Sequence, residues 1–254
     1  MTNVICAIAK CEEDYIKDWV EWHLNLGFDH IYVYDNSDTE EKALKNYYIN
    51  EKLTYIPVYG VHENMFQIKC YNEFYNSHTF DWCAYIDIDE YIVLEKWENI
   101  KDFLNDFSDY QVIRLNWRIY GDDDLVFRDM TKPVYTLKQR VINHPYEFHG
   151  KEIVKGGFNA NICSTHYSLI DGNLPKQIMP DGKETLGKVS DLHKCNEAYI
   201  NHYMTKTLSE FVNQKLSRTD ACFKDRKLDM SYYWDINRKT PKKINWLINN
   251  GYGV

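Results

Sequence analysis

Short apolar runs alternate with helical patterns through the first ninety residues of the chain. The run at residues 4–9 is continuous, as expected for a strand buried on both faces. Apolar positions from Tyr15 to Leu26 then recur at helical spacing, and Gly27 follows them. Further strands are expected at 30–34, at 53–58 and from 82 onward, and further helices at 40–50 and 66–77. This alternation predicts an α/β fold with a mostly parallel sheet flanked by helices.

The second half of the chain has less regular patterns. Strands are expected at 111–117, 152–157 and 161–167, and a helix at 208–216. No linker rich in proline and serine separates the two halves, so we expect a single domain.

Three carboxylates, Asp87, Asp89 and Glu90, follow the apolar strand that begins at Trp82. Side chains two apart in a strand share a face, so a continuing strand would place Asp87 with Asp89 and turn Glu90 away. Buried carboxylates need a cation or hydrogen-bond donors, and hard oxygen ligands suit Mg²⁺ or Mn²⁺. The pattern therefore predicts a divalent-cation site, although acidic pairs also cap helices and decorate surfaces.

Polar clusters also follow the first two strands, at residues 10–14 and 35–38. The carboxyl ends of parallel strands meet at one edge of a sheet, which is where ligands bind in such folds. We therefore expect these clusters and residues 87–90 to form one site. No glycine-rich phosphate loop follows the first strand, which disfavours a dinucleotide or P-loop site.

Composition narrows the class of protein. The chain has 254 residues, of which 44% are hydrophobic, and this excludes a disordered chain. Its net charge of −8 disfavours nucleic acid as a partner. Seven cysteines without a regular framework indicate a reducing compartment. Because we see neither a leader pattern nor an apolar stretch long enough to span a membrane, we expect a cytoplasmic protein.

Several segments carry motifs that occur together in a known group of enzymes. They lie at residues 7–13, 19–23, 27–37, 87–91, 116–121 and 202–206. In this order they resemble the family 2-type glycosyltransferases, in the branch related to glycosyltransferase family 92. The resemblance implies a GT-A fold, a nucleotide-sugar donor and Mn²⁺ or Mg²⁺ as cofactor. It further implies a nucleotide-sugar-binding half at 1–95, an acceptor half at 96–220 and a C-terminal extension at 221–254.

The resemblance also implies roles for residues of the first half. Asp35 would accept a hydrogen bond from the uracil imide N–H, and Ala9 and Glu12 would lie along the nucleoside. Gln67 and Lys69 would contact the diphosphate or the ribose. The alternative for Asp35 is an ordinary turn residue, and the alternative for Lys69 is a solvated charge on a helix.

A metal site is implied in the same way. Asp89 would bind the cation directly, and Asp87 would bind the ribose or reach the cation through water. Enzymes of this fold often add a late histidine, for which the sequence offers His202 and His166. Each of these is equally a core histidine packed beside aromatic residues.

An inverting transfer needs a general base for the acceptor hydroxyl and positive charge at the departing diphosphate. We favour Glu152 and then Asp123 as the base. The full set of candidates is Asp122, Asp123, Asp124, Glu147, His149 and Glu152. Lys206 and Lys215 either neutralise the diphosphate or form a solvated helix face.

These features predict a metal-dependent, inverting glycosyltransferase that moves a sugar from a UDP-sugar to a glycan or lipid-linked acceptor in polysaccharide biosynthesis. Two alternatives are a nucleotidyltransferase, whose basic phosphate loop is missing at 10–13, and a non-catalytic carbohydrate-binding protein. The basic and apolar segment 238–248 either contacts the inner face of an anionic membrane or docks on the core as a helix.

Overall fold

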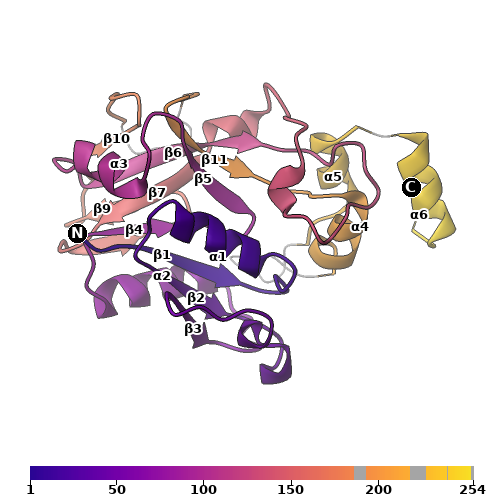
Figure 1. Ribbon diagram of the computed structural model, residues 1–254, viewed down its shortest axis with the longest axis horizontal. Coiled ribbons are helices and arrows are strands. Elements are labelled where there is room, and N and C mark those ends of the chain that lie inside the picture. Colours follow the sequence, from indigo (N-terminus) through magenta and orange to yellow (C-terminus); the bar gives the residue numbers. More distant parts are fainter. Residues whose placement is uncertain (186–192, 218–226, 239, 253–254) are drawn as a thin grey trace.

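The computed structural model describes residues 1–185, 193–217, 227–238 and 240–252. A large mixed sheet runs through the centre, and helices lie against it (Figure 1). Five of the eight strand pairs in this sheet are parallel and three are antiparallel. The predicted α/β class, with a mostly parallel sheet flanked by helices, is therefore confirmed.

The sheet joins strands from both halves of the chain. Across it lie β3 (Leu53–Pro57), β2 (His30–Asp35), β1 (Asn3–Ala9), β4 (Trp82–Tyr85), β7 (Gly150–Lys155), β6 (Val112–Ile119), β11 (Ala198–His202) and β5 (Glu90–Leu94), with β10 (Gln177–Ile178) paired to β6. A separate hairpin pairs β8 (Ala160–Ile162) with β9 (Ser168–Ile170).

The α-helices are α1 (Ile16–Asn25), α2 (Phe66–Ser77), α3 (Ile100–Asp106), α4 (Leu208–Glu210), α5 (Met230–Ile236) and α6 (Pro241–Asn249). The π-helical segment η6 (Phe211–Lys215) continues α4. Short 3₁₀ turns are η1 (Glu40–Lys42), η2 (Leu44–Asn46), η3 (Val134–Thr136) and η4 (Pro145–Phe148).

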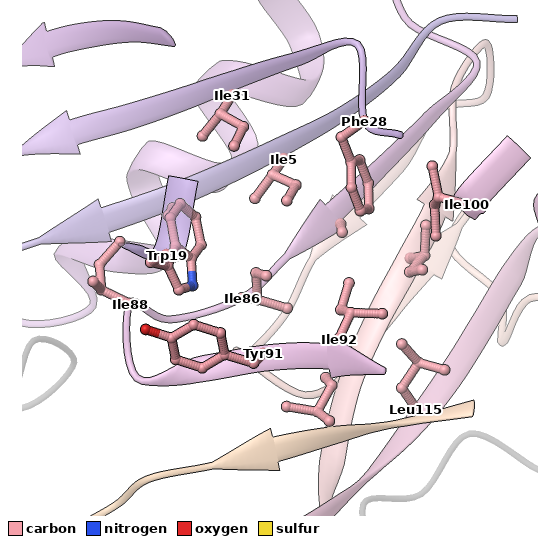
Figure 2. Packing of buried hydrophobic residues seen from close by; sticks show 14 of the residues in the cluster. Ile5, Trp19, Phe28, Ile31, Ile86, Ile88, Tyr91, Ile92, Ile100 and Leu115 are labelled. Carbon is pink, nitrogen blue, oxygen red and sulfur yellow. The ribbon is translucent and has the colours of Figure 1, made fainter. Parts of the chain in front are cut away.

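Strand β1 is buried on both faces, as its continuous apolar run predicts. Successive side chains alternate between two hydrophobic clusters, because neighbours in a strand point to opposite sides. Ile5 and Ala7 pack in the cluster that contains Trp19 of α1, and Cys6 packs in the cluster that contains Tyr71 of α2. Figure 2 shows the first cluster, where the Trp19 ring lies near Ile88 and Tyr91.

Helix α1 also fixes the position of β5 through polar contacts. The indole Nε1 of Trp19 donates to the Glu90 carbonyl oxygen at 2.8 Å, and Trp22 Nε1 donates to the Ile92 carbonyl oxygen at 2.8 Å. His23 Nε2 accepts a hydrogen bond from the Ile92 N–H at 3.2 Å. Helix α1 therefore holds β5, and with it the acidic turn that precedes β5, in a fixed position.

Three local predictions from the sequence are wrong. The strand expected at 161–167 ends at Ile162, and residues 163–167 form an irregular connection to β9. Residues 40–50 form the turns η1 and η2 rather than one helix, because Ala43 between them has ψ 140°. The strand β4 ends at Tyr85, before the carboxylates, so the alternation expected through Glu90 does not hold. Instead, residues 86–89 form a turn and Glu90 begins β5.

The C-terminal helices lie at the end of the molecule remote from the N-terminus (Figure 1). Lys243 of α6 is fully buried, with Nζ 2.5 Å from Asp122 Oδ2 and 3.4 Å from Asp124 Oδ1. Leu247 is buried in the same helix, whereas Ile248 is 57% exposed. This helix therefore docks on the core through one face, and a membrane contact through it stays a prediction.

Within the described residues, the helices are all too short or too polar to cross a membrane. Lys239 of the basic segment lies outside the described residues, as does the boundary expected between residues 220 and 221.

Candidate functional site

A cavity of 540 Å³ opens beyond the carboxyl ends of β1, β2 and β4. Its lining includes Ala9, Lys10, Glu12, Asn36, Gln67, Asp87 and Asp89 from the first half of the chain. From the second half it includes Trp117, Tyr146, His149, Lys151, His166, His202, Lys215 and Tyr232. The polar clusters expected at one edge of the sheet thus share one cavity with side chains from the second half.

Long-range pairing brings the charged groups of the cavity together. Asp87 and Asp89 lie in the turn between β4 and β5, and β5 pairs antiparallel with β11 so that His202 stands opposite Glu90. Lys151 belongs to β7, the antiparallel neighbour of β4.

Asp89 is buried in the turn and lies beside two basic side chains. It is 5% exposed, with Oδ2 2.5 Å from Lys215 Nζ and Oδ1 3.4 Å from His202 Nε2. Burial alone would raise the pKa of Asp89, but the positive charge of Lys215, together with the adjacent imidazole of His202, holds that pKa well below its usual range. Asp89 is therefore ionised.

Asp87 has a donor at each oxygen. Gln67 Nε2 donates to Oδ1 at 2.7 Å, and Lys151 Nζ donates to Oδ2 at 2.7 Å. Burial opposes ionisation, but Lys151 outweighs it and lowers the pKa of Asp87 from its ordinary value. Asp87 is thus an ion-pair partner of Lys151 within the cavity wall.

Glu90 points back toward the turn, whereas a continuing strand would turn it away. Its Oε2 accepts a hydrogen bond from the Asp87 N–H at 2.8 Å and lies 3.7 Å from Lys151 Nζ. Burial, aided by the charges of Asp87 and Asp89, raises the pKa of Glu90 well above its usual range despite Lys151. This reversal follows from the early end of β4.

The donor set at Asp89 fits a divalent cation. A carboxylate oxygen and an imidazole nitrogen, here 3.4 Å apart on Asp89 and His202, are ligand types that Mn²⁺ accepts. Among the described residues, however, no three His, Cys, Asp or Glu side chains are grouped as a complete metal site. A cation held here would keep positions open for oxygens of a bound ligand.

His166 lines the cavity in a different role from His202. Its Nδ1 is 2.8 Å from the Gly150 carbonyl oxygen, and its ring contacts the indole of Trp117 edge-on at 5.2 Å. Burial, with the nearby charge of Lys151, lowers the pKa of His166 to about 4. This hydrogen bond ties the ring to β7, and metal binding by His166 stays a prediction.

Four of the six residues implied for nucleotide-sugar contacts line the cavity, namely Ala9, Glu12, Gln67 and Asp87. Lys69 lies outside it, exposed on α2 with Nζ 3.5 Å from Glu63 Oε2.

Asp35 also lies outside the cavity lining, because the turn after β2 uses both of its oxygens. Its Oδ1 accepts from the Ser37 N–H at 3.1 Å and from Ser37 Oγ at 2.6 Å. Its Oδ2 accepts from the Leu44 N–H at 2.8 Å, and Asp35 is fully buried. The geometry is that of a turn-forming residue, the alternative reading of the sequence.

Neither favoured base lines the cavity. Glu152 follows Lys151 on β7 and so faces the other side of the sheet, where its Oε1 is 3.7 Å from Arg114 Nε and its Oε2 accepts from Ser168 Oγ at 2.7 Å. Asp123 accepts hydrogen bonds from the N–H groups of Lys138 and Gln139. Both carboxylates therefore have structural partners away from the acidic turn.

Sequence reasoning missed Lys151 and the aromatic wall formed by Trp117 and Tyr146. The one available signal for Lys151 was a lysine within the strand expected around residues 152–157. Lys215, for which two roles were open, reaches the acidic turn. Lys206 is buried, with Nζ 3.2 Å from Glu12 Oε2, rather than solvated.

Comparison with known proteins decides the family. The model of glycosyltransferase family 92 matches residues 5–242, nearly the whole chain. The chain belongs to glycosyltransferase family 92. The resemblance predicted from the sequence motifs is thereby confirmed, and the match spans every residue named above for the cavity.

Solved structures resemble this family 92 chain only distantly. The crystal structure of TarS 1–349 from S. aureus is 14% identical with a TM-score of 0.37, over 61% of this chain and 47% of that one. HddC from Yersinia pseudotuberculosis complexed with GMP-PN is also 14% identical, with a TM-score of 0.38, over 80% of this chain and 93% of that one. This chain thus spans about half the length of TarS 1–349, and a search of curated proteins found no match.

The buried Glu152 predicts a pH-dependent stability. Burial, only partly offset by Arg114, raises the pKa of Glu152 to about 7, so its favourable contribution is complete below the pKa of the unfolded chain and is lost as pH rises through 7. Glu152→Gln removes this dependence. Relative to wild type, its free energy of unfolding should rise by about 2 kcal/mol between about pH 5 and about pH 8.

Urea unfolding of both proteins across this pH range measures the effect. Glu51→Gln, which alters an exposed carboxylate, serves as the matched control and should follow the wild-type curve. Parallel curves for Glu152→Gln and wild type would contradict the assignment.

Proposed function

We propose that this family 92 protein is a glycosyltransferase that uses a divalent cation and a UDP-sugar donor. It transfers the sugar, with inversion, to a hydroxyl group of a glycan or lipid-linked acceptor during polysaccharide assembly. The observation that carries the proposal is the ionised Asp89, held beside His202 and Lys215 in the cavity. Family membership supports the class of reaction.

The charges of the cavity suit a departing diphosphate. As the bond between the anomeric carbon and the diphosphate breaks, negative charge develops on the leaving UDP, and fixed positive groups lower the energy of that state. Lys215 and Lys10 both line the cavity. A divalent cation bound by Asp89 and His202 would supply additional positive charge to the leaving group.

Other residues of the cavity suit the donor nucleoside and sugar. Ala9 and Glu12 follow β1, at the carboxyl edge of the parallel strands where nucleotides bind in α/β sheets. Gln67 reaches the same region from α2 and holds Asp87 in place. The cavity volume of 540 Å³ lies within the range of small-molecule sites.

Calorimetric titration with UDP tests the donor and the cation together. We expect UDP to bind in the presence of Mn²⁺ and to bind at least about tenfold more weakly with chelator, while ADP and GDP bind more weakly than UDP. The same samples are then supplied with UDP-galactose, UDP-glucose and UDP-N-acetylglucosamine, and released UDP is measured.

Each alternative function has its own outcome in this experiment. Release of pyrophosphate from UTP, without release of UDP from any UDP-sugar, would favour a nucleotidyltransferase. Absence of nucleotide binding under both conditions would reject the proposal and leave a carbohydrate-binding protein.

A further inference from the structure

Three imidazoles surround the indole ring of Trp117 in the cavity. The ring of His202 is 4.5 Å from it, that of His166 is 5.2 Å from it, and that of His149 is stacked on it at 6.0 Å, centroid to centroid. His202 pairs with Asp89, and His166 is bonded to the Gly150 carbonyl oxygen. Neither ring nitrogen of His149 has a hydrogen-bond partner in the described part of the chain.

The carboxylates that line the cavity are poor proton acceptors. Asp87 is paired with Lys151 at 2.7 Å, and Asp89 with Lys215 at 2.5 Å. An ionised carboxylate held by an ammonium group accepts a further proton reluctantly, because the ion pair stabilises its charged form. Of the two remaining cavity carboxylates, Glu12 lies 3.2 Å from Lys206 Nζ and Glu63 lies 3.5 Å from Lys69 Nζ.

Of the six residues that sequence analysis offered as base, only His149 lines the cavity. Four of the other five are engaged in ion pairs within the fold, including Asp124, which lies 3.4 Å from Lys243 Nζ. Asp122 pairs with Lys243, Glu147 with Arg140, and Glu152 with Arg114.

The backbone around His149 is held against the neighbouring strand β6. The carbonyl oxygen of His149 accepts a hydrogen bond from the Trp117 N–H at 2.8 Å, which fixes the start of β7 against β6. At Gly150 the two strands approach so closely that an added Cβ would lie 1.9 Å from the Leu115 carbonyl oxygen. The imidazole is therefore presented from a packed strand end rather than from a loose loop.

We propose that His149 is the general base of the transfer, an inference that rests on the proposed function. The acceptor oxygen forms a bond to the anomeric carbon, and the bond from that carbon to the diphosphate breaks with its electron pair leaving on UDP. The acceptor proton passes to a ring nitrogen of His149 and then to water. Burial lowers the pKa of His149, so that the imidazole is neutral and able to accept this proton at neutral pH.

Aromatic rings next to His149 are consistent with an acceptor site. The ring of Tyr146 lies 5.7 Å from that of His149 and 6.5 Å from that of Tyr232. Such surfaces offer apolar faces with polar edges, which suit a sugar ring.

The test compares His149→Gln and His149→Ala with wild type. With Mn²⁺ and whichever of the three UDP-sugars wild type uses, UDP release is measured over a panel of methyl glycosides. We expect kcat to fall by about 10²-fold to 10⁴-fold in both variants. The KM for the UDP-sugar and the calorimetric Kd for UDP should stay within about twofold, because His149 does not hold the donor.

Added imidazole provides the decisive readout. It should restore part of the activity of His149→Ala and leave wild type and His30→Gln, a substitution on β2 outside the cavity lining, unchanged. A kcat for His149→Ala within about threefold of wild type would overturn the proposal, as would a loss of activity explained by lost UDP binding. If wild type itself neither binds UDP nor releases it from a UDP-sugar, the proposed function fails and this inference falls with it.

Discussion

Asp89→Asn is expected to lower UDP-sugar turnover by at least about 10²-fold and to remove the effect of Mn²⁺ on UDP binding. The substitution keeps the size of the side chain but removes the negative charge that lies 2.5 Å from Lys215 and 3.4 Å from His202. Because the pKa of Asp89 lies well below the ordinary value of an aspartate, the wild-type side chain is ionised at every pH used for assay. UDP release and calorimetric titration measure the two effects separately.

Asp109→Asn is the matched control, since Asp109 is an exposed carboxylate remote from the cavity lining. It should retain wild-type turnover and wild-type response to Mn²⁺. Thermal unfolding of both variants checks that the fold survives. A fully active Asp89→Asn enzyme with unchanged Mn²⁺ dependence would contradict the assignment of Asp89 as the cation ligand.

Local sequence patterns predicted the first half of the fold well. The continuous run at β1 and the periodic positions of α1 are properties of neighbouring residues, and burial on both faces of β1 follows directly from them. The position of Asp87 and Asp89 beside the end of a buried strand was predictable for the same reason.

The direction of Glu90 was not predictable, because it depends on where β4 ends. The strand stops at Tyr85, and β5 is then drawn to β11, more than a hundred residues later in the chain. Only this distant partner sets Glu90 opposite His202 and turns its carboxylate toward the acidic cluster.

The second wall of the cavity escaped prediction for a related reason. Strand β7 enters the sheet antiparallel between β4 and β6, a pairing that no local period encodes. Which of Lys151 and Glu152 faces the cavity depends on the register of that pairing, since one residue of slip exchanges the two faces. The spacing of the base candidates could not choose among them, and Glu152 was favoured, whereas the structure turns Lys151 toward Asp87.

Arg114→Met should be the most destabilising substitution that we predict, costing about 3 to 5 kcal/mol of unfolding free energy at about pH 8. Arg114 is fully buried on β6, with Nε 3.7 Å from Glu152 Oε1 and Nη2 donating to the His166 carbonyl oxygen at 3.1 Å. Its loss leaves Glu152 buried without its countercharge, so that the carboxylate either stays ionised at a cost or takes up a proton. Urea unfolding at two pH values measures the cost.

The cost of Arg114→Met should shrink at about pH 5, because Glu152 then carries a proton in both proteins and has no charge to compensate. The double variant Arg114→Met/Glu152→Gln should be more stable than Arg114→Met at about pH 8, since it removes the unpaired charge. Arg118→Met, on the same strand but partly exposed, should cost no more than about 1 kcal/mol. An Arg114→Met cost that is equal at both pH values, and unchanged by Glu152→Gln, would mean that packing rather than the ion pair holds this part of the sheet. That result would contradict the structural role assigned to Glu152. This carboxylate would then again be a candidate for the general base.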